Sequence, residues 1–182
     1  MDMRDYALFV IPVIVIVYGI FILFMHPPLR VMRASLLGGL VMALLNIAGD
    51  LIAIHTSQWY YNASGLVGQL PLPLYTTSFL ITGGLAYLLI WRFWRGPYHW
   101  LALLLLPGVP VFGYARDFWQ AGLTASILVW RGPFAWAGDL LLWVVMFFAG
   151  WLVFRALAPA RSMETKPAET GALVLRTNSE ES

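Results

Sequence analysis

Five long apolar stretches divide this sequence and leave few folds open to it. They cover residues 6–25, 34–54, 70–91, 100–114 and 134–154. A helix needs about 20 apolar residues to cross a hydrocarbon core roughly 30 Å thick, and a helix also satisfies its own backbone polar groups in lipid. The sequence therefore predicts an all-α fold, a polytopic membrane helix bundle with five transmembrane helices.

Composition supports a membrane protein and excludes several kinds of site. Hydrophobic residues make up 60% of the 182 residues and charged residues 11%, whereas about a quarter of the residues in a soluble domain are charged. The basic residues are scattered and the net charge is only +2, so we expect the lipid bilayer as a partner and no nucleic acid. Cysteine is absent, which excludes disulfides, thiolate metal ligands and a cysteine nucleophile. We expect a single integral membrane domain over residues 1–158.

The distribution of Lys and Arg predicts the orientation in the membrane. Positive charge accumulates in cytoplasmic loops, which indicates an outside amino terminus and a cytoplasmic carboxyl terminus, in a bacterial inner (plasma) membrane. Seven basic residues lie on the predicted cytoplasmic side, namely Arg30, Arg33, Arg92, Arg95, Arg155, Arg161 and Lys166, against Arg4, Arg116 and Arg131 on the other.

Two segments lie outside this simple pattern. Residues 118–130 are apolar and uncharged, but at about 1.5 Å per residue they reach only about 20 Å. We therefore expect a short re-entrant or interfacial helix there, while a sixth crossing would move the carboxyl terminus outside. Residues 159–182 carry Ser, Thr and Glu without apolar periodicity, which predicts a disordered cytoplasmic tail.

Four charged residues enter the apolar stretches, and the predicted topology places all of them near the outer side. They are Asp50, Arg116, Asp117 and Asp139. Charge within a bilayer is costly and marks either a functional site or a packed ion pair. We expect one polar pocket near the outer leaflet, with Asp50 and Asp139 as candidate catalytic acids and Arg116 setting their charge. Asp117 also fits a plain surface charge.

The surroundings of the two aspartates are alike, since the tetrapeptide Ala-Gly-Asp-Leu occurs at residues 48–51 and again at 137–140. Two carboxyls in one low-dielectric pocket can differ enough for one to hold a proton and act as a general acid. Candidate substrate-binding residues at the same depth are Arg116, His55, Trp59 and Tyr61. In a purely structural alternative, Arg116 neutralises one of the aspartates, and the aromatic residues belong to the interfacial belt.

No metal site and no cofactor are expected. His26 and His99 fall at the predicted cytoplasmic boundary and His55 at the outer one, so the three histidines do not meet.

A spaced pattern begins at Asp50 and continues through residue 72. It consists of Asp50, the Ala53-Ile54 pair, Trp59, Tyr61, Gly68 and Leu70-Pro71-Leu72. In this pattern the chain resembles the membrane lycopene cyclase domain of carotenoid biosynthesis. The resemblance implies a small helical bundle that acts on long isoprenoid chains by proton-initiated cyclisation without a metal.

The chain departs from that family at one important place. Where the family has two glutamates, this sequence has Pro73 and Leu74, and no Glu occurs before Glu164. Only Asp50 carries over as an acidic position.

Two functions stay open from the sequence. The first is a protein that binds or modifies a lipophilic isoprenoid or carotenoid-like substrate, as a metal-free, acid-initiated cyclase or hydratase. The second is a noncatalytic membrane component, such as a small transporter subunit, an assembly factor or a partner-binding scaffold. Small residues such as Gly38-Gly39 and Ala149-Gly150 allow close helix contacts, within the bundle or in a homo- or hetero-oligomer.

Overall fold

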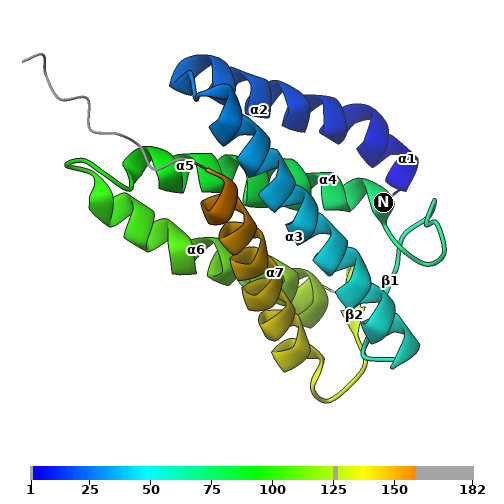
Figure 1. Cartoon of the computed structure of the whole chain (residues 1–182). Coiled ribbons are helices and arrows are strands. Elements are labelled where there is room, and N and C mark those ends of the chain that lie inside the picture. Colours follow the sequence, from blue (N-terminus) through cyan, green and yellow to red (C-terminus); the bar gives the residue numbers. More distant parts are fainter. Residues whose placement is uncertain (1, 125–126, 159–182) are drawn as a thin grey trace, which may run out of the picture.

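The computed structural model describes residues 2–124 and 127–158, and it contains the five long helices that the apolar stretches predict (Figure 1). Each has between 22 and 27 residues, a length that matches a bilayer core of roughly 30 Å. The chain is therefore a multi-pass membrane protein. The five spans are Met3–Met25, Leu29–His55, Leu72–Phe93, His99–Thr124 and Ala135–Leu157.

Three of the spans are built from several helical segments. The first joins α1 (Met3–Asp5), η1 (Tyr6–Val10) and α2 (Ile11–Met25), and the second is α3 (Leu29–His55) alone. The third joins η2 (Leu72–Leu74), α4 (Tyr75–Thr77), η3 (Ser78–Leu85) and α5 (Ala86–Phe93). The fourth joins α6 (His99–Phe118) and η4 (Trp119–Thr124), and the fifth is α7 (Ala135–Leu157).

The third span lies at the centre of the bundle and holds its core together. Tyr87 of α5 is fully buried and donates a hydrogen bond of 2.8 Å to the carbonyl oxygen of Phe147 on α7. Its ring also stacks on Phe154, with ring centroids 5.7 Å apart. One large aromatic side chain thus fixes the third span against the fifth, by a hydrogen bond and by packing.

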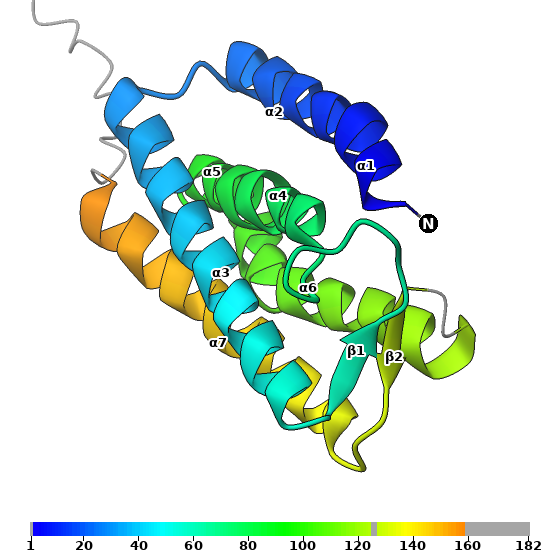
Figure 2. The same cartoon turned by 90° about the vertical axis from the view of Figure 1, so that its right-hand side faces the viewer.

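Helices α3 and α7 lie side by side because glycines face each other between them (Figure 2). A methyl group added at Gly38 would lie 2.7 Å from the carbonyl oxygen of Gly150, and one added at Gly39 would meet the main chain of Phe79. These glycine faces are occupied by helices of the same chain. Packing within the bundle is the first of the two uses that the sequence offered for these small residues.

Two short strands tie two loops of the bundle together. Strand β1 (Trp59–Tyr61) follows α3, and strand β2 (Leu128–Trp130) precedes α7, and the two pair in antiparallel fashion (Figure 2). Trp59 is opposite Trp130, and Tyr61 is opposite Leu128.

We call the pair of strands β1 and β2 the ribbon. It corrects the prediction for residues 118–130. No separate re-entrant helix is present among the described residues of that segment. Phe118 and η4 extend the fourth span as far as Thr124, and Leu128–Trp130 form β2. Pairing with β1 satisfies the backbone polar groups on one edge of β2, so a short apolar segment need not be helical there.

The two ends of the bundle differ in charge. The turn after α2, the turn after α5 and the end of α7 lie together at one end, away from the ribbon (Figure 1). Five of the seven residues assigned to the basic side lie at this end: Arg30, Arg33, Arg92, Arg95 and Arg155. Arg161, Lys166 and the predicted disordered tail at 159–182 lie outside the described residues.

Candidate functional site

A cavity of about 310 Å³ lies at the ribbon end of the bundle. We call it the acidic cavity, because it collects Asp50, Asp117 and Asp139 together with Arg116. The sequence predicted that these four residues share one depth, and the structure brings them to one place. The remaining lining residues are Tyr6, Asn46, Tyr61, Leu74, Tyr75, Thr77, Ser78, Gln120, Ile127 and Leu128.

Asp50 is fixed by three hydrogen-bond donors and is only 2% exposed. Trp59 Nε1 donates to Oδ1 over 3.0 Å, while the hydroxyls of Tyr61 and Tyr75 donate to Oδ2 over 2.8 Å and 2.6 Å. An ionised carboxylate only accepts hydrogen bonds, and charge-assisted bonds of this kind stabilise buried negative charge without a cation. The arrangement therefore suits a fixed, negatively charged Asp50.

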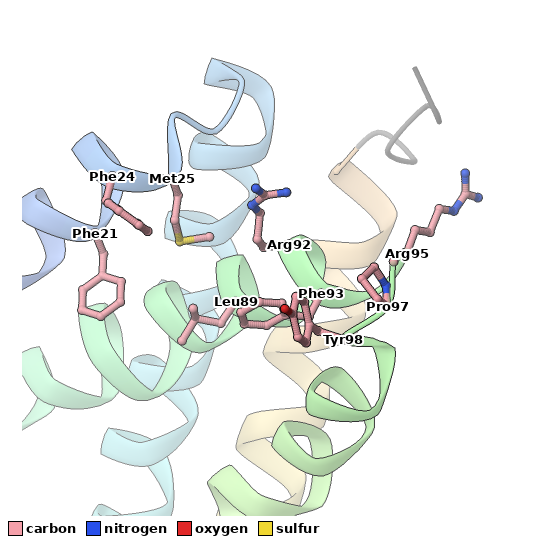
Figure 3. A pocket seen from close by; sticks show the side chains of 10 residues that line it. Phe21, Phe24, Met25, Leu89, Arg92, Phe93, Arg95, Pro97 and Tyr98 are labelled. Atoms are coloured by element: carbon pink, nitrogen blue, oxygen red, sulfur yellow. The ribbon is translucent and has the colours of Figure 1, made fainter. Parts of the chain in front are cut away.

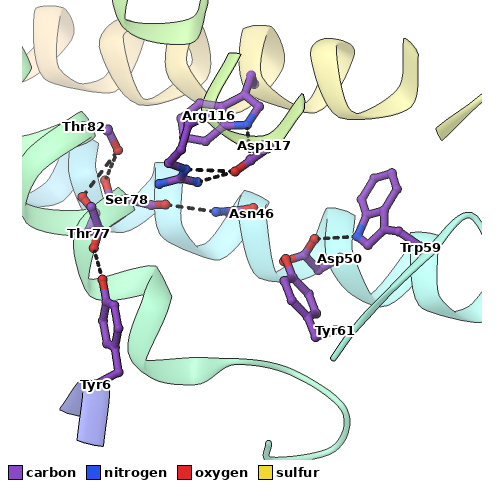
Figure 4. A network of polar contacts seen from close by, with 11 residues as sticks. Tyr6, Asn46, Asp50, Trp59, Tyr61, Thr77, Ser78, Thr82, Arg116 and Asp117 are labelled. Atoms are coloured by element: carbon purple, nitrogen blue, oxygen red, sulfur yellow. Dashed lines mark hydrogen bonds and ion pairs between the residues drawn. The ribbon is translucent and has the colours of Figure 1, made fainter. Parts of the chain in front are cut away.

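The chain reversal after α3 brings Trp59 and Tyr61 back to Asp50. Ser57 adopts a left-handed conformation with φ of 56°, and Gln58 N donates to the carbonyl oxygen of Ala53 over 2.8 Å. β1 then returns beside the end of α3, so that residues 9 and 11 positions beyond Asp50 contact its carboxylate (Figure 4). Trp59 is 5% exposed, which makes its alternative assignment to the interfacial aromatic belt wrong.

Tyr61 lies outside the spans, and its hydroxyl donates a hydrogen bond to Asp50 in the cavity. Burial, and next the negative charge of Asp50, raise the pKa of the Tyr61 phenol well above its ordinary value. The hydroxyl therefore keeps its proton and its hydrogen bond to Asp50 in neutral and moderately alkaline solution.

Asp139 lines the same cavity from α7 but has a different environment. It is 4% exposed, and its buried Oδ2 has no hydrogen-bond partner among residues 2–124 and 127–158. Trp59 approaches the same turn of α7, since a methyl group added at Gly138 would lie 3.6 Å from its ring. An unsatisfied buried carboxylate is costly, so the carboxyl of Asp139 requires either its own proton or a donor from a bound molecule.

Arg116 pairs with its sequence neighbour, which corrects the structural alternative for this residue. Its guanidinium contacts Asp117 Oδ1, with Nε at 2.9 Å and a terminal nitrogen at 2.7 Å (Figure 4). It also lies over the ring of Trp143, 5.3 Å from the centroid, which is within cation–π range. The structure shows no salt bridge from Arg116 to Asp50 or Asp139 within the described chain.

Asp117 is a buried member of this group, so its interpretation as plain surface charge is wrong. It is 9% exposed, and Trp143 Nε1 donates to its Oδ2 over 2.7 Å. Asp117 thus joins α6 to α7 through the indole of Trp143, while Arg116 balances its charge.

Polar residues of the first, second and third spans complete the cavity, and the sequence analysis missed them. Tyr6 bonds to Thr77 over 2.8 Å, and Asn46 donates to Ser78 over 3.0 Å (Figure 4). A usable signal was present, because the run Tyr75-Thr76-Thr77-Ser78 is a polar stretch at the start of an apolar span. Its depth matches that of Asp50, as the bond from Tyr75 shows.

Two of the predicted binding residues do not line the acidic cavity: Trp59 reaches it only through its bond to Asp50, and His55 is not brought in. It ends α3, is exposed, and is not among the residues that line the acidic cavity. In the described part of the chain, no group of three or more His, Asp or Glu side chains is arranged to hold a metal ion.

Comparisons with known proteins place the chain in no family. A scan against protein-family models and searches of curated proteins and of solved structures found no match. Its class therefore follows from its own residues: it is an integral membrane protein with five candidate spans and a buried acidic cavity at one end.

Proposed function

We propose that this protein binds one end of a lipophilic, unsaturated molecule in the acidic cavity and transfers a proton to it. The chemical class is an isoprenoid or carotenoid-like chain, and the reaction is a metal-free cyclisation or hydration. One observation carries the proposal: Asp50 accepts three hydrogen bonds, whereas Asp139 Oδ2, in the same cavity, accepts none from residues 2–124 and 127–158. Two acids in unlike environments suit the separate roles of proton donor and charge stabiliser.

Asp139 is assigned as the acid. Its carboxyl lines the cavity and lacks a protein donor in the described chain, so it is free to give its proton to a carbon–carbon double bond. The proton forms a new C–H bond with the electron pair of the double bond, and a carbocation remains on the neighbouring carbon. A second double bond or a water molecule then supplies electrons to that carbon, and a proton returns to the Asp139 carboxylate.

Asp50 is assigned as the group that stabilises the developing positive charge. A fixed negative charge in a site that excludes water acts strongly on a cation formed nearby. Tyr61 and Tyr75 hold the Asp50 oxygens in place, and their rings border the cavity, where an aromatic face also attracts a cation. Tyr61 lines the cavity and would contact the apolar part of the ligand, whereas Trp59 acts through its hydrogen bond to Asp50.

The size of the cavity sets how much of a ligand it can hold. About 310 Å³ is at the lower limit of typical ligand sites, which enclose roughly 300–1,000 Å³. One end of a long polyene fits such a volume and the remainder lies in the bilayer. The resemblance of residues 50–72 to membrane lycopene cyclases supports the same ligand class, although Pro73 and Leu74 replace the glutamates of that family.

Extraction of a bound ligand tests the proposal. The full-length protein is purified from a host that makes linear polyenes, extracted with organic solvent, and the extract is analysed by mass spectrometry. We expect an isoprenoid or polyene in wild type, unconverted substrate with Asp139→Asn, and loss of bound ligand with Asp50→Asn. Asp5→Asn changes an exposed acid and is the matched control. The proposal fails if wild type carries no such molecule and Asp139→Asn leaves the lipid and pigment composition of the cell unchanged.

Orientation and membrane type are part of the same proposal. The basic end of the bundle, with Arg30, Arg33, Arg92, Arg95 and Arg155, is assigned to the cytoplasm, and the acidic cavity to the outer leaflet of a bacterial inner membrane. Labelling of single cysteines placed at Ser64 and at Gly96, in a chain that has no native cysteine, tests this assignment, because only the Ser64 site should react from outside.

A second candidate function is a noncatalytic membrane component. The observation that favours it is that Asp50 and Asp117 each have complete sets of partners, as charges that only hold helices together would have. A stable partner protein that co-purifies with wild type, together with the absence of bound lipid, would favour this function over the first.

A further inference from the structure

A second hollow lies at the opposite, basic end of the bundle and encloses about 560 Å³. We call it the arginine groove. Its apolar walls come from two helices: Phe21, Phe24 and Met25 of α2 face Leu89 and Phe93 of α5 (Figure 3). Five apolar side chains from two neighbouring spans therefore line the hollow.

The groove lies beside the carboxyl-terminal end of α2. Ile14 and Tyr18 are the buried residues of this helix, and the Tyr18 hydroxyl is 3.2 Å from Ser35 Oγ on α3. Near the end of α2, Ile22 and Met25 still pack against the core, whereas Leu23 and Phe24 are 71% and 84% exposed. The last two turns of α2 thus border the groove while facing the surroundings of the bundle.

The rim of the groove is cationic and amphipathic. Arg92 and Arg95 line it from α5 and the following turn, and Tyr98 adds a hydroxyl and a ring that meets Phe93 edge-on at 6.5 Å. In Figure 3 the side chain of Arg92 extends toward the level of Met25, whereas Arg95 points away from the rings. None of the described residues that line the groove is acidic.

We infer that the arginine groove binds one anionic phospholipid, with the phosphate at Arg92 and an acyl chain along Phe21, Phe24 and Phe93. An apolar slot between membrane helices is filled by an acyl chain, and a guanidinium donates two hydrogen bonds to a phosphate oxygen pair. Basic pockets at the ends of spans select anionic head groups. Tyr98 donates a further hydrogen bond to the phosphate or ester oxygens.

The charge distribution around the groove argues for a lipid rather than a second copy of this chain. Arg30, Arg33 and Arg155 lie at the same end of the bundle. Two copies that met through this end would bring like charges together, which opposes association, whereas an anionic lipid is attracted by all of them.

Competition between two lipids tests the inference. Purified full-length protein in detergent is incubated with equal amounts of phosphatidylglycerol and phosphatidylcholine of identical acyl chains, and bound lipid is counted by native mass spectrometry. We expect phosphatidylglycerol to be preferred, with the preference falling about fivefold in Arg92→Gln and less in Arg95→Gln. Arg155→Gln removes the same charge from α7 and should keep most of the preference.

Several outcomes would overturn the inference. Equal binding of the two lipids by wild type would show that the groove does not select charge. If Arg155→Gln lost as much of the preference for phosphatidylglycerol as Arg92→Gln, the net charge of the whole basic end would select the lipid, and not Arg92. Displacement of phosphatidylglycerol by equimolar glycerol 1-phosphate would show a simple anion site without an acyl slot, and a protein dimer in place of bound lipid would make the groove a contact between copies. All three arginines are exposed, so the variants are expected to fold, and equal melting temperatures would confirm this.

Discussion

The phenol of Tyr75 donates a hydrogen bond of 2.6 Å to Asp50 Oδ2, and thereby joins the start of the third span to the second. Both residues are buried, and a hydrogen bond to a buried charged group contributes about 1.5–3 kcal/mol. Asp50 is therefore a structural anchor as well as a part of the proposed site.

Removal of this donor should weaken the fold. We expect Tyr75→Phe to lower the free energy of unfolding by about 1.5–3 kcal/mol, measured by denaturant titration in mild detergent. Tyr60→Phe is a matched control, because the Tyr60 ring packs under Arg131, 4.2 Å from the guanidinium carbon, and keeps that contact. Equal loss in both variants would contradict the role given to the Tyr75 hydroxyl.

The two cavity acids should differ in stability when each is replaced by Asn. In Asp50→Asn the new amide NH2 faces hydrogen-bond donors of Trp59, Tyr61 and Tyr75 and cannot accept from them. We expect this variant to lose about 1.5–3 kcal/mol in unfolding free energy. Asp139→Asn breaks no hydrogen bond to Oδ2 in the described chain, and should cost less than about 1 kcal/mol. Thermal melting of the two variants side by side checks the difference, and the reverse order would refute it.

The indole of Trp143 should stabilise the bundle through Asp117. Trp143→Phe removes the donor at 2.7 Å from Asp117 Oδ2 and replaces the indole under Arg116 with a smaller ring, and we expect a loss of about 1–3 kcal/mol in unfolding free energy. Trp136→Phe lies on the same helix at 50% exposure and should have little effect. The change in indole fluorescence on unfolding, compared between the two variants, would also show whether Trp143 or Trp136 reports the unfolding of α7.

The close approach of α3 and α7 should not tolerate a side chain. In Gly38→Ala the new methyl group meets the carbonyl oxygen of Gly150 at 2.7 Å, and we expect overpacking to cost about 1–3 kcal/mol. Gly19→Ala places its methyl where nothing lies within 4 Å, and should be neutral or stabilise α2 by up to about 1 kcal/mol. Unchanged melting of Gly38→Ala would contradict the tight contact.

The fold was largely predictable from the sequence because a bilayer permits few solutions. Apolar length alone identified the five spans, and the shared depth of Asp50, Arg116, Asp117 and Asp139 predicted one polar pocket. In segment 118–130 the residues up to Thr124 are helical but continue the fourth span, and residues 128–130 form a strand. Helix length and hydropathy say nothing about pairing with a distant strand at residues 59–61. Register between two three-residue strands depends on tertiary contacts.

The partners within the site were less predictable than its members. The sequence showed that Arg116 needs an anion but not which one, and the structure gives it Asp117. It offered Trp59 as a belt residue because interfacial aromatics are common, whereas the turn at Ser57 directs the indole back toward Asp50. Hydrogen-bond partners depend on chain reversals, which apolar periodicity does not record.

The pairing of β1 with β2 has a consequence for how the protein is made. Residues 128–130 are synthesised about 70 positions after residues 59–61, and they follow all the residues of the first four spans. The indole of Trp59 and the phenol of Tyr61 belong to β1, which can pair only after residues 128–130 have been synthesised. The surroundings of Asp50 are thus completed late in biogenesis, and a truncated product that stops before residue 128 would lack the strand that pairs with Trp59 and Tyr61.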